Sequence, residues 1–263
     1  MSATKIFQEG SFTATGAHLF QPEVTTVIVE NDAYITQSAN TWGMLLEPPG
    51  AWTVTVNGAL TAPQDALLLL TGDSIKNSKV SVGVEGYVWS ATPFYDAIHA
   101  FQALDVSNAG TVNGAGAGIH IGNAQAAGKG STITNAATGA IIGQAGSGID
   151  SDNPDLTLTV KNAGTIAGSS YGISWMHGAT ITNTGTITGN LLATDSGDTM
   201  ANSITNSGSV GGIQLSSGND MVKNTGHIDG AVFLYAGNNT LINGGVIERS
   251  IYGGIDIDTQ VHG

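Results

Sequence analysis

Four polar side chains recur at one position of a short repeated motif, and their types could support acid–base or metal chemistry. The motif reads Ala-Ile-His-Ala, Gly-Ile-His-Ile, Gly-Ile-Asp-Ser and Gly-Ile-Ser-Trp, and the four residues are His99, His120, Asp150 and Ser174. If the copies are strands that stack in order, these side chains form one line on an outer face. A catalytic triad is excluded, because histidine must lie between nucleophile and carboxylate. Here Asp150 would lie in the middle, with Ser174 about 9.6 Å from His120.

Two other chemistries remain open for this line. His120 and Asp150 could act as general acid and base on a glycan that lies along the strands. Alternatively, the two histidines could bind a metal ion together with Asp150. The candidate glycan surface consists of His99, His120, Trp175 and His177, with Tyr95 nearby. The simpler alternative is that outward positions of amphipathic strands are polar without any chemical role.

Calcium binding is a third candidate chemistry. Three stretches, Asp195–Ser203, Ser216–Asn224 and Tyr235–Asn243, place carboxylate and amide oxygens in tight Gly-rich turns. These stretches resemble the Gly-rich turns of RTX-type exported proteins, and the resemblance implies Ca²⁺ ligands on adjacent stacked turns. The candidate ligands are Asp195, Asp198, Asp220 and Asn238. The alternative is that they are solvated corner residues, and no other cofactor is indicated.

The composition limits the classes of partner that the chain can bind. Of 263 residues only 10% are charged, and 7 Lys and Arg face 20 Asp and Glu, a formal net charge of -13. Nucleic acid is excluded as a partner because phosphate binding needs basic clusters. A polyanionic sugar is disfavoured for the same reason, whereas calcium or a neutral glycan suits an acidic surface. No apolar run is long enough for membrane insertion.

The elements that would position these side chains come from a repeat built on Asn-x-Gly. The copies follow each other at 27, 27, 21, 23, 18 and 19 residues, too short for a helical hairpin. Stacked copies would place their asparagines in one inward column, where each amide can bond the next. The column consists of Asn108, Asn135, Asn162, Asn183, Asn206, Asn224 and Asn243.

Each repeat reads as three short strands without a helix. Thr and Ile alternate with period 2, as in Thr180-Ile181-Thr182, and we expect Gly and Asn at the corners to adopt positive φ. The sequence therefore predicts an all-β fold, a single right-handed parallel β-helix (a β-solenoid) of about ten coils. The expected boundaries are a capping or docking segment at 1–23, irregular coils at 24–104, regular coils at 105–259 and a tail at 260–263.

The regular coils resemble the repeats of autotransporter passengers and filamentous-haemagglutinin-type adhesins, which are secreted bacterial surface proteins. In addition, the three Gly-rich turns resemble degenerate turns of RTX-type proteins, which are exported without a cleaved N-terminal signal. The first residues, MSATKIFQEG, contain no apolar run typical of a signal peptide. The chain departs from both families, because it has no translocator barrel and no consecutive nonapeptides. The resemblance implies an extracellular or cell-surface location.

The expected function is that of an exported structural or adhesive surface or matrix protein, which presents a hydroxyl-rich face to a glycan or a cell-surface receptor. No capping element follows the last coil, so we also expect self-association into head-to-tail stacks or filaments. Light scattering that shows a monomer at all concentrations would exclude this. The alternative function, from a different class, is a polysaccharide lyase or hydrolase that uses His120 and Asp150.

Overall fold

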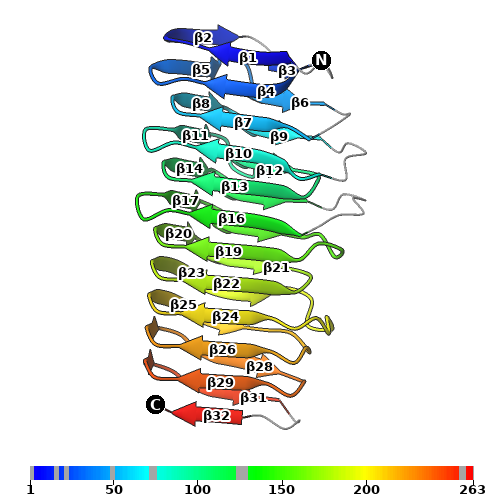
Figure 1. Ribbon diagram of the computed structural model, residues 1–263, viewed down its shortest axis with the longest axis vertical. Helices are drawn as coiled ribbons and strands as arrows, with labels where there is room; N and C mark the ends of the chain where they lie inside the picture. The colour runs from blue at the N-terminus through cyan, green and yellow to red at the C-terminus, as the bar shows by residue number, and fades with distance from the viewer. Residues whose placement is uncertain are drawn as a thin grey trace.

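The computed structural model describes residues 3–14, 18–20, 24–47, 51–70, 76–122, 130–254 and 259–262. These residues form strands and turns, and none of them belongs to a helix. The strands coil into one right-handed parallel solenoid with three faces, which confirms the predicted fold (Figure 1). No described segment is a long apolar helix of the kind that crosses a membrane.

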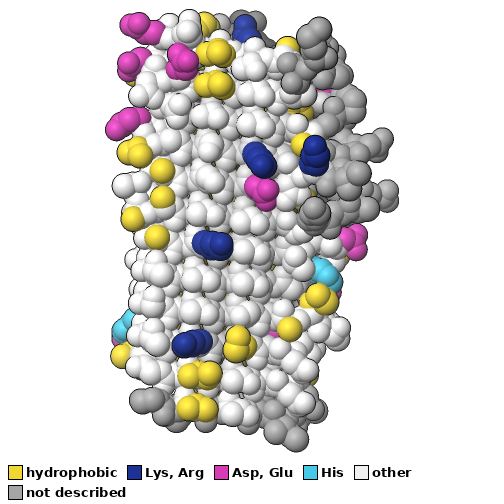
Figure 2. All heavy atoms as spheres, in the orientation of Figure 1, with side chains coloured by type: hydrophobic (Ala, Val, Ile, Leu, Met, Phe, Trp, Pro, Cys, Tyr) yellow, Lys and Arg dark blue, Asp and Glu magenta, His cyan; other side chains and the backbone are white. Residues whose placement is uncertain are grey.

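The first face is a twelve-stranded parallel sheet with one strand from each coil. Buried aliphatic residues alternate along its strands with exposed Thr, Ser or Lys, as the period-2 pattern predicts. Figure 2 shows this face with few charged side chains, so uncharged polar groups cover most of it. Its strands are β1 (Ala3–Phe7), β4 (Val24–Val29), β7 (Thr53–Val56), β10 (Ser78–Val82), β13 (Leu104–Asn108), β16 (Ser131–Asn135), β19 (Leu158–Asn162), β22 (Ala179–Asn183), β24 (Ser203–Asn206), β26 (Met221–Asn224), β29 (Thr240–Asn243) and β32 (Thr259–His262).

The second and third faces join into a 20-stranded sheet, because β23 (Thr186–Ala193) and β25 (Ser209–Gln214) run across the corner between them. The other strands of the second face are β2 (Gly10–Ala14), β5 (Ala33–Gln37), β8 (Ala59–Ala62), β11 (Tyr87–Ser90), β14 (Thr111–Gly114), β17 (Ala140–Gly143), β20 (Thr165–Gly168), β27 (His227–Ile228) and β30 (Val246–Ile247). Those of the third face are β3 (His18–Phe20), β6 (Met44–Leu46), β9 (Leu67–Leu69), β12 (Ile98–Ala100), β15 (Ile119–Ile121), β18 (Ile149–Ser151), β21 (Ile173–Trp175), β28 (Val232–Tyr235) and β31 (Ile251–Gly253).

The core is a stack of aliphatic side chains, one or two from each strand. In one coil, Ile181 of β22 and Ile187 and Leu191 of β23 are at most 1% exposed. Full burial of each such side chain contributes about 1.5–3 kcal/mol. The solenoid is therefore held together by the inward residues of the alternating pattern.

The two ends of the chain contribute strands to the solenoid. The described part of segment 1–23 forms a further coil on the one that begins at Val24, since β1, β2 and β3 pair in parallel with β4, β5 and β6. It is thus not a separately folded cap. Likewise, the expected tail is a strand rather than an extension, because β32 pairs with β29 along its whole length. Residues 1, 2, 15–17, 21–23 and 263 lie outside the described part of these segments.

The glycine of the Asn-x-Gly motif is required because the backbones of successive coils approach closely there. Our expectation that this glycine has a positive φ was wrong. A Cβ atom added to Gly164 or Gly185 would lie 2.2 Å from the carbonyl oxygen of the equivalent glycine one coil earlier. Neither glycine has a positive φ. Among the described residues, positive φ occurs elsewhere, at Gly10, Asp32, Phe94, Gly178, Gly189, Tyr235 and Gly237. Stacked corners are so tight at the motif that only a residue without a side chain fits.

Candidate functional site

The seven motif asparagines lie in one inward column. The side-chain amide of each donates a hydrogen bond of 2.8 Å to the side-chain oxygen of the next, from Asn108 through to Asn243. Each amide nitrogen also lies within hydrogen-bond distance of a glycine carbonyl of its own corner, as between Asn183 and Gly185 at 3.2 Å. The column begins at Asn108 because the equivalent residue of the preceding coil is Val82. Its role is structural, since all seven side chains are used in pairing.

The four candidate calcium ligands form hydrogen bonds with neighbouring groups of the protein. Asp220 lies in a second inner column, where its Oδ1 accepts hydrogen bonds from the backbone and side-chain nitrogens of Asn202 at 2.7 and 3.0 Å. Its own backbone N–H donates to Asn239 at 2.9 Å. Burial raises the pKa of Asp220 to about 6, against the hydrogen bonds from Asn202, which lower it. Asp220 therefore pairs successive coils.

The other candidate calcium ligands form hydrogen bonds with groups close to them. Asp195 accepts a hydrogen bond from the N–H of Gly197 within its own turn. Asp198 accepts one from Gly178 at 3.0 Å. The backbone N–H of Asn238 donates to a neighbouring asparagine side chain. Calcium binding by these residues stays a prediction from the sequence.

The line of polar residues on the third face forms in the predicted order. Strand pairing places His99 beside His120, His120 beside Asp150, and Asp150 beside Ser174. The two imidazoles stack at 4.5 Å between ring centroids. Residues 21 to 30 positions apart in the sequence thus become neighbours through the stacking of coils.

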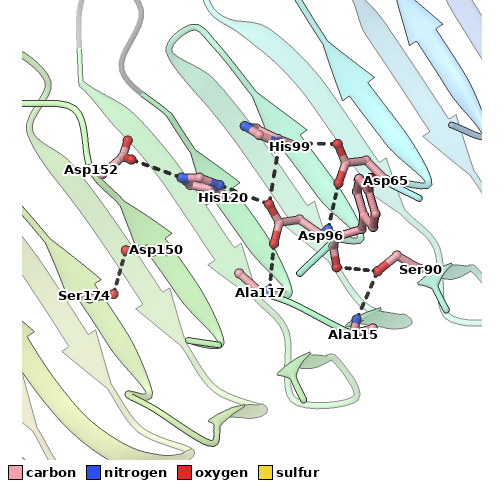
Figure 3. A network of polar contacts seen from close by, with 11 residues as sticks. Asp65, Ser90, Asp96, His99, Ala115, Ala117, His120, Asp150, Asp152 and Ser174 are labelled. Atoms are coloured by element: carbon pink, nitrogen blue, oxygen red, sulfur yellow. Dashed lines mark hydrogen bonds and ion pairs between the residues drawn. The ribbon is translucent and has the colours of Figure 1, made fainter. Parts of the chain in front are cut away.

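Two further carboxylates face the histidines from the turns that precede β9 and β12 (Figure 3). Asp65 and Asp96 occupy equivalent positions in successive coils, and each uses Oδ1 to accept a backbone N–H of the next coil at 2.7 Å. Their Oδ2 atoms point to the imidazoles. Nδ1 of His99 lies 3.3 Å from Asp65 and 3.5 Å from Asp96, and Nδ1 of His120 lies 3.0 Å from Asp96.

The carboxylates determine the protonation of His120. Burial would lower its pKa, but the hydrogen bond to Asp96 and the negative charges of Asp96, Asp150 and Asp152 outweigh burial and raise the pKa to about 9. Burial raises the pKa of Asp150, against the hydrogen bond from Ser174 and the charge of His120. At neutral pH the site therefore contains an imidazolium ion among several carboxylates.

Ser174 is not a nucleophile of a triad. Its hydroxyl donates to Oδ1 of Asp150 at 2.7 Å and lies 2.8 Å from the hydroxyl of Ser147. The side chain is only 2% exposed, and no hydrogen bond within the described part of the chain connects it to an imidazole. The exclusion of a triad made from the sequence agrees with this geometry.

A groove of about 420 Å³ opens beside these residues. Phe94 is 91% exposed and has a φ of 74°. A bulky residue with positive φ is an outlier that costs about 1–3 kcal/mol. The groove is lined by polar side chains and two aromatic rings, including Asp96, His120, Ser147, Asp150, Ser174, Phe94 and Tyr171.

The candidate glycan surface is only partly formed as expected. Trp175 is 1% exposed and its indole N–H donates to Asn202 inside the solenoid, so its proposed role in sugar stacking was wrong. His177 faces Asp198 at 3.5 Å and does not line the groove. Tyr95 accepts a hydrogen bond from Gln64, and its neighbour Phe94 lines the groove instead.

The sequence contains a signal for the residues that we missed. Asp65 and Asp96 both occur as Asp-Ala followed by an aliphatic strand, in Asp-Ala-Leu-Leu and Asp-Ala-Ile-His. The repeated Asp-Ala marks equivalent corners of two coils, and the same alignment would have placed both carboxylates beside the histidines.

No protein-family model matches the chain, and searches of curated proteins and of solved structures also found no match. The resemblance to autotransporter passengers, haemagglutinin-type adhesins and RTX turns therefore remains a prediction from the repeats.

Proposed function

We propose that this protein is an exported structural and adhesive β-solenoid of a bacterial surface or matrix, and that it binds a neutral glycan in the groove between Phe94 and Tyr171. The observation that carries the proposal is one groove that combines an exposed aromatic ring with polar lining groups. Such a combination suits a sugar, whose apolar face packs on aromatic rings while its hydroxyls bond polar groups. The net charge of -13 favours a neutral ligand over an acidic one.

The backbone of Phe94 adds support. The φ of Phe94 is 74°, and because the ring is exposed, no burial of the side chain offsets this strain. Strained residues of this kind are common at ligand sites, where the fold holds a side chain in place for a partner. A contact between the Phe94 ring and a ligand would account for the strain.

Replacement of Phe94 by glycine is expected to weaken glycan binding at least about tenfold, equivalent to about 1.4 kcal/mol. Stability should stay the same or rise, because glycine adopts positive φ without strain. Neutral and acidic oligosaccharides on an array would identify ligands, and titration calorimetry would measure affinity. Asp32→Gly is a matched control, because Asp32 also has positive φ but does not line the groove.

Two outcomes would contradict this assignment. If no neutral glycan binds the wild-type protein, the adhesive part of the proposal fails. If a glycan binds equally well to Phe94→Gly but more weakly to Lys79→Ala, the ligand lies in the shallow hollow of the first face, which Lys79 lines.

An enzyme that cleaves a polysaccharide is the second candidate, favoured by the presence of His120 and Asp150 in the same groove. His120, with a pKa raised to about 9, would serve as a general acid at neutral pH, and Asp150 would serve as a base. Turnover of a neutral or acidic polysaccharide that is lost in His120→Ala would establish this function over simple binding.

A further inference from the structure

We infer that Asp65, Asp96, His99 and His120 form a Zn²⁺ site that joins three successive coils of the solenoid. This replaces the sequence-based candidate, in which Asp150 was the carboxylate ligand. Asp96, His99 and His120 each offer a ligand atom within 4.8 Å of the others, and Asp65 approaches the same imidazole nitrogen as Asp96. The inference does not rest on the proposed glycan binding.

Three of the distances between donor atoms are close to those of tetrahedral zinc. Bonds of about 2.0–2.1 Å from Zn²⁺ to nitrogen and oxygen require donors about 3.3–3.4 Å apart. The nitrogen of His99 lies 3.3 and 3.5 Å from the two carboxylates, and that of His120 lies 3.0 Å from Asp96. Zinc binding would require the two stacked imidazoles to turn until both Nδ1 lone pairs point to the ion, and Asp65 to move closer to His120.

The chemical types of the donors also favour zinc. Two imidazole nitrogens with two carboxylate oxygens suit Zn²⁺, whereas Ca²⁺ and Mg²⁺ prefer oxygen donors alone. Both carboxylates are largely buried, with side chains 6% and 9% exposed for Asp65 and Asp96. Among the described residues, both carboxylates form their ion pairs with these two imidazoles. A divalent cation would thus neutralise two buried carboxylates.

The carboxylates are fixed before any metal binds. Oδ1 of Asp65 is bonded to the N–H of Asp96, and Oδ1 of Asp96 to the N–H of Ala117, which orients both Oδ2 atoms to the imidazoles. Hydrogen bonds of this kind hold metal ligands in position and increase affinity. The site would connect the coils that contain β9, β12 and β15.

Calorimetric titration of the chelator-treated full-length chain with ZnCl₂ tests the site. We expect one Zn²⁺ per chain and a thermal transition that rises with zinc concentration. X-ray absorption should report only nitrogen and oxygen donors at about 2.0–2.1 Å, including imidazole. His99→Ala and Asp65→Asn should each weaken binding at least about 100-fold. Asp65→Asn retains an oxygen for the N–H of Asp96, so it separates loss of metal from loss of fold.

The matched control is His227→Ala, which removes the imidazole of the exposed cluster of His227, Asp229 and Glu248. Zinc binding that survives this change and is lost in Asp65→Asn supports the inference. Absence of zinc binding to the wild-type chain would overturn it, as would binding that depends on His227 but not on His99.

Discussion

Gly185→Ala is expected to lower the free energy of unfolding by about 3 kcal/mol or more, or to prevent folding. The added Cβ would lie 2.2 Å from the carbonyl oxygen of Gly164 and 2.6 Å from that of Ala163. Both are backbone atoms of the coil before it, so the coils would have to separate and lose hydrogen bonds. Urea unfolding followed by circular dichroism would measure the change.

Gly244→Ala is the matched control, because a Cβ at Gly244 meets no atom within 4 Å. We expect a change within about 0.5–1 kcal/mol, and a small gain if the unfolded chain loses freedom. Equal effects of the two substitutions would contradict close stacking of the corners. The glycine would then matter only for backbone flexibility.

Asn183→Val is expected to cost about 2–4 kcal/mol, the second largest effect. The substitution removes the hydrogen bonds that join Asn183 to Asn162 and Asn206, each 2.8 Å long, and leaves the Asn206 side-chain oxygen buried without that donor. Valine fits this position in shape, because Val56 and Val82 occupy it in earlier coils. The loss would therefore report on hydrogen bonding.

Thr182→Val is the control for this second prediction. Thr182 is the exposed neighbour of Asn183 on β22, so the change should be within about 0.5 kcal/mol. If Asn183→Val proved as harmless as Thr182→Val, the asparagine column would contribute nothing to stability. Native-state hydrogen exchange of the amides in β19 and β24 would show the same contrast locally.

The solenoid could be predicted from the sequence because each of its coils repeats one local pattern. The alternation of Thr and Ile gives the buried face of each strand, and Asn-x-Gly marks one corner in each coil from Asn108 to Asn243 except that of Asn135. The irregular early coils were also located, for example in the stretch that forms β7, β8 and β9. Their common feature is the same alternation with longer corners.

The interior position of Trp175 could have been derived from the same alternation. Ile173 faces inward, and a residue two positions later on a strand faces the same way. Our assignment of Trp175 to a sugar surface neglected this period. The partners of the histidines were harder to find, because Asp65 and Asp96 lie outside the strands, where the alternation gives no signal and only the repeated Asp-Ala marks them.

The environment of each charged group could not be predicted from the sequence. Asp220 looks like a solvated turn residue in the sequence, but stacking buries it between Asn202 and Asn239. The groove likewise depends on Phe94 and Tyr171, which belong to different coils and lie outside the repeat. Such features depend on which corners project and which are covered. That can be seen only in the three-dimensional arrangement of the coils.

Every site described above depends on the register of the coils, and cysteine crosslinking tests that register most directly. The chain has no cysteine, and the exposed residues Thr134, Lys161 and Thr182 lie side by side on successive strands of the first face. A short thiol crosslinker should join the pair Thr134→Cys and Lys161→Cys, about 4.8 Å apart, in the purified protein. It should not join Thr134→Cys to Thr182→Cys, about 9.6 Å apart. Efficient crosslinking of the second pair, or none of the first, would contradict the stacked solenoid and the sites built on it.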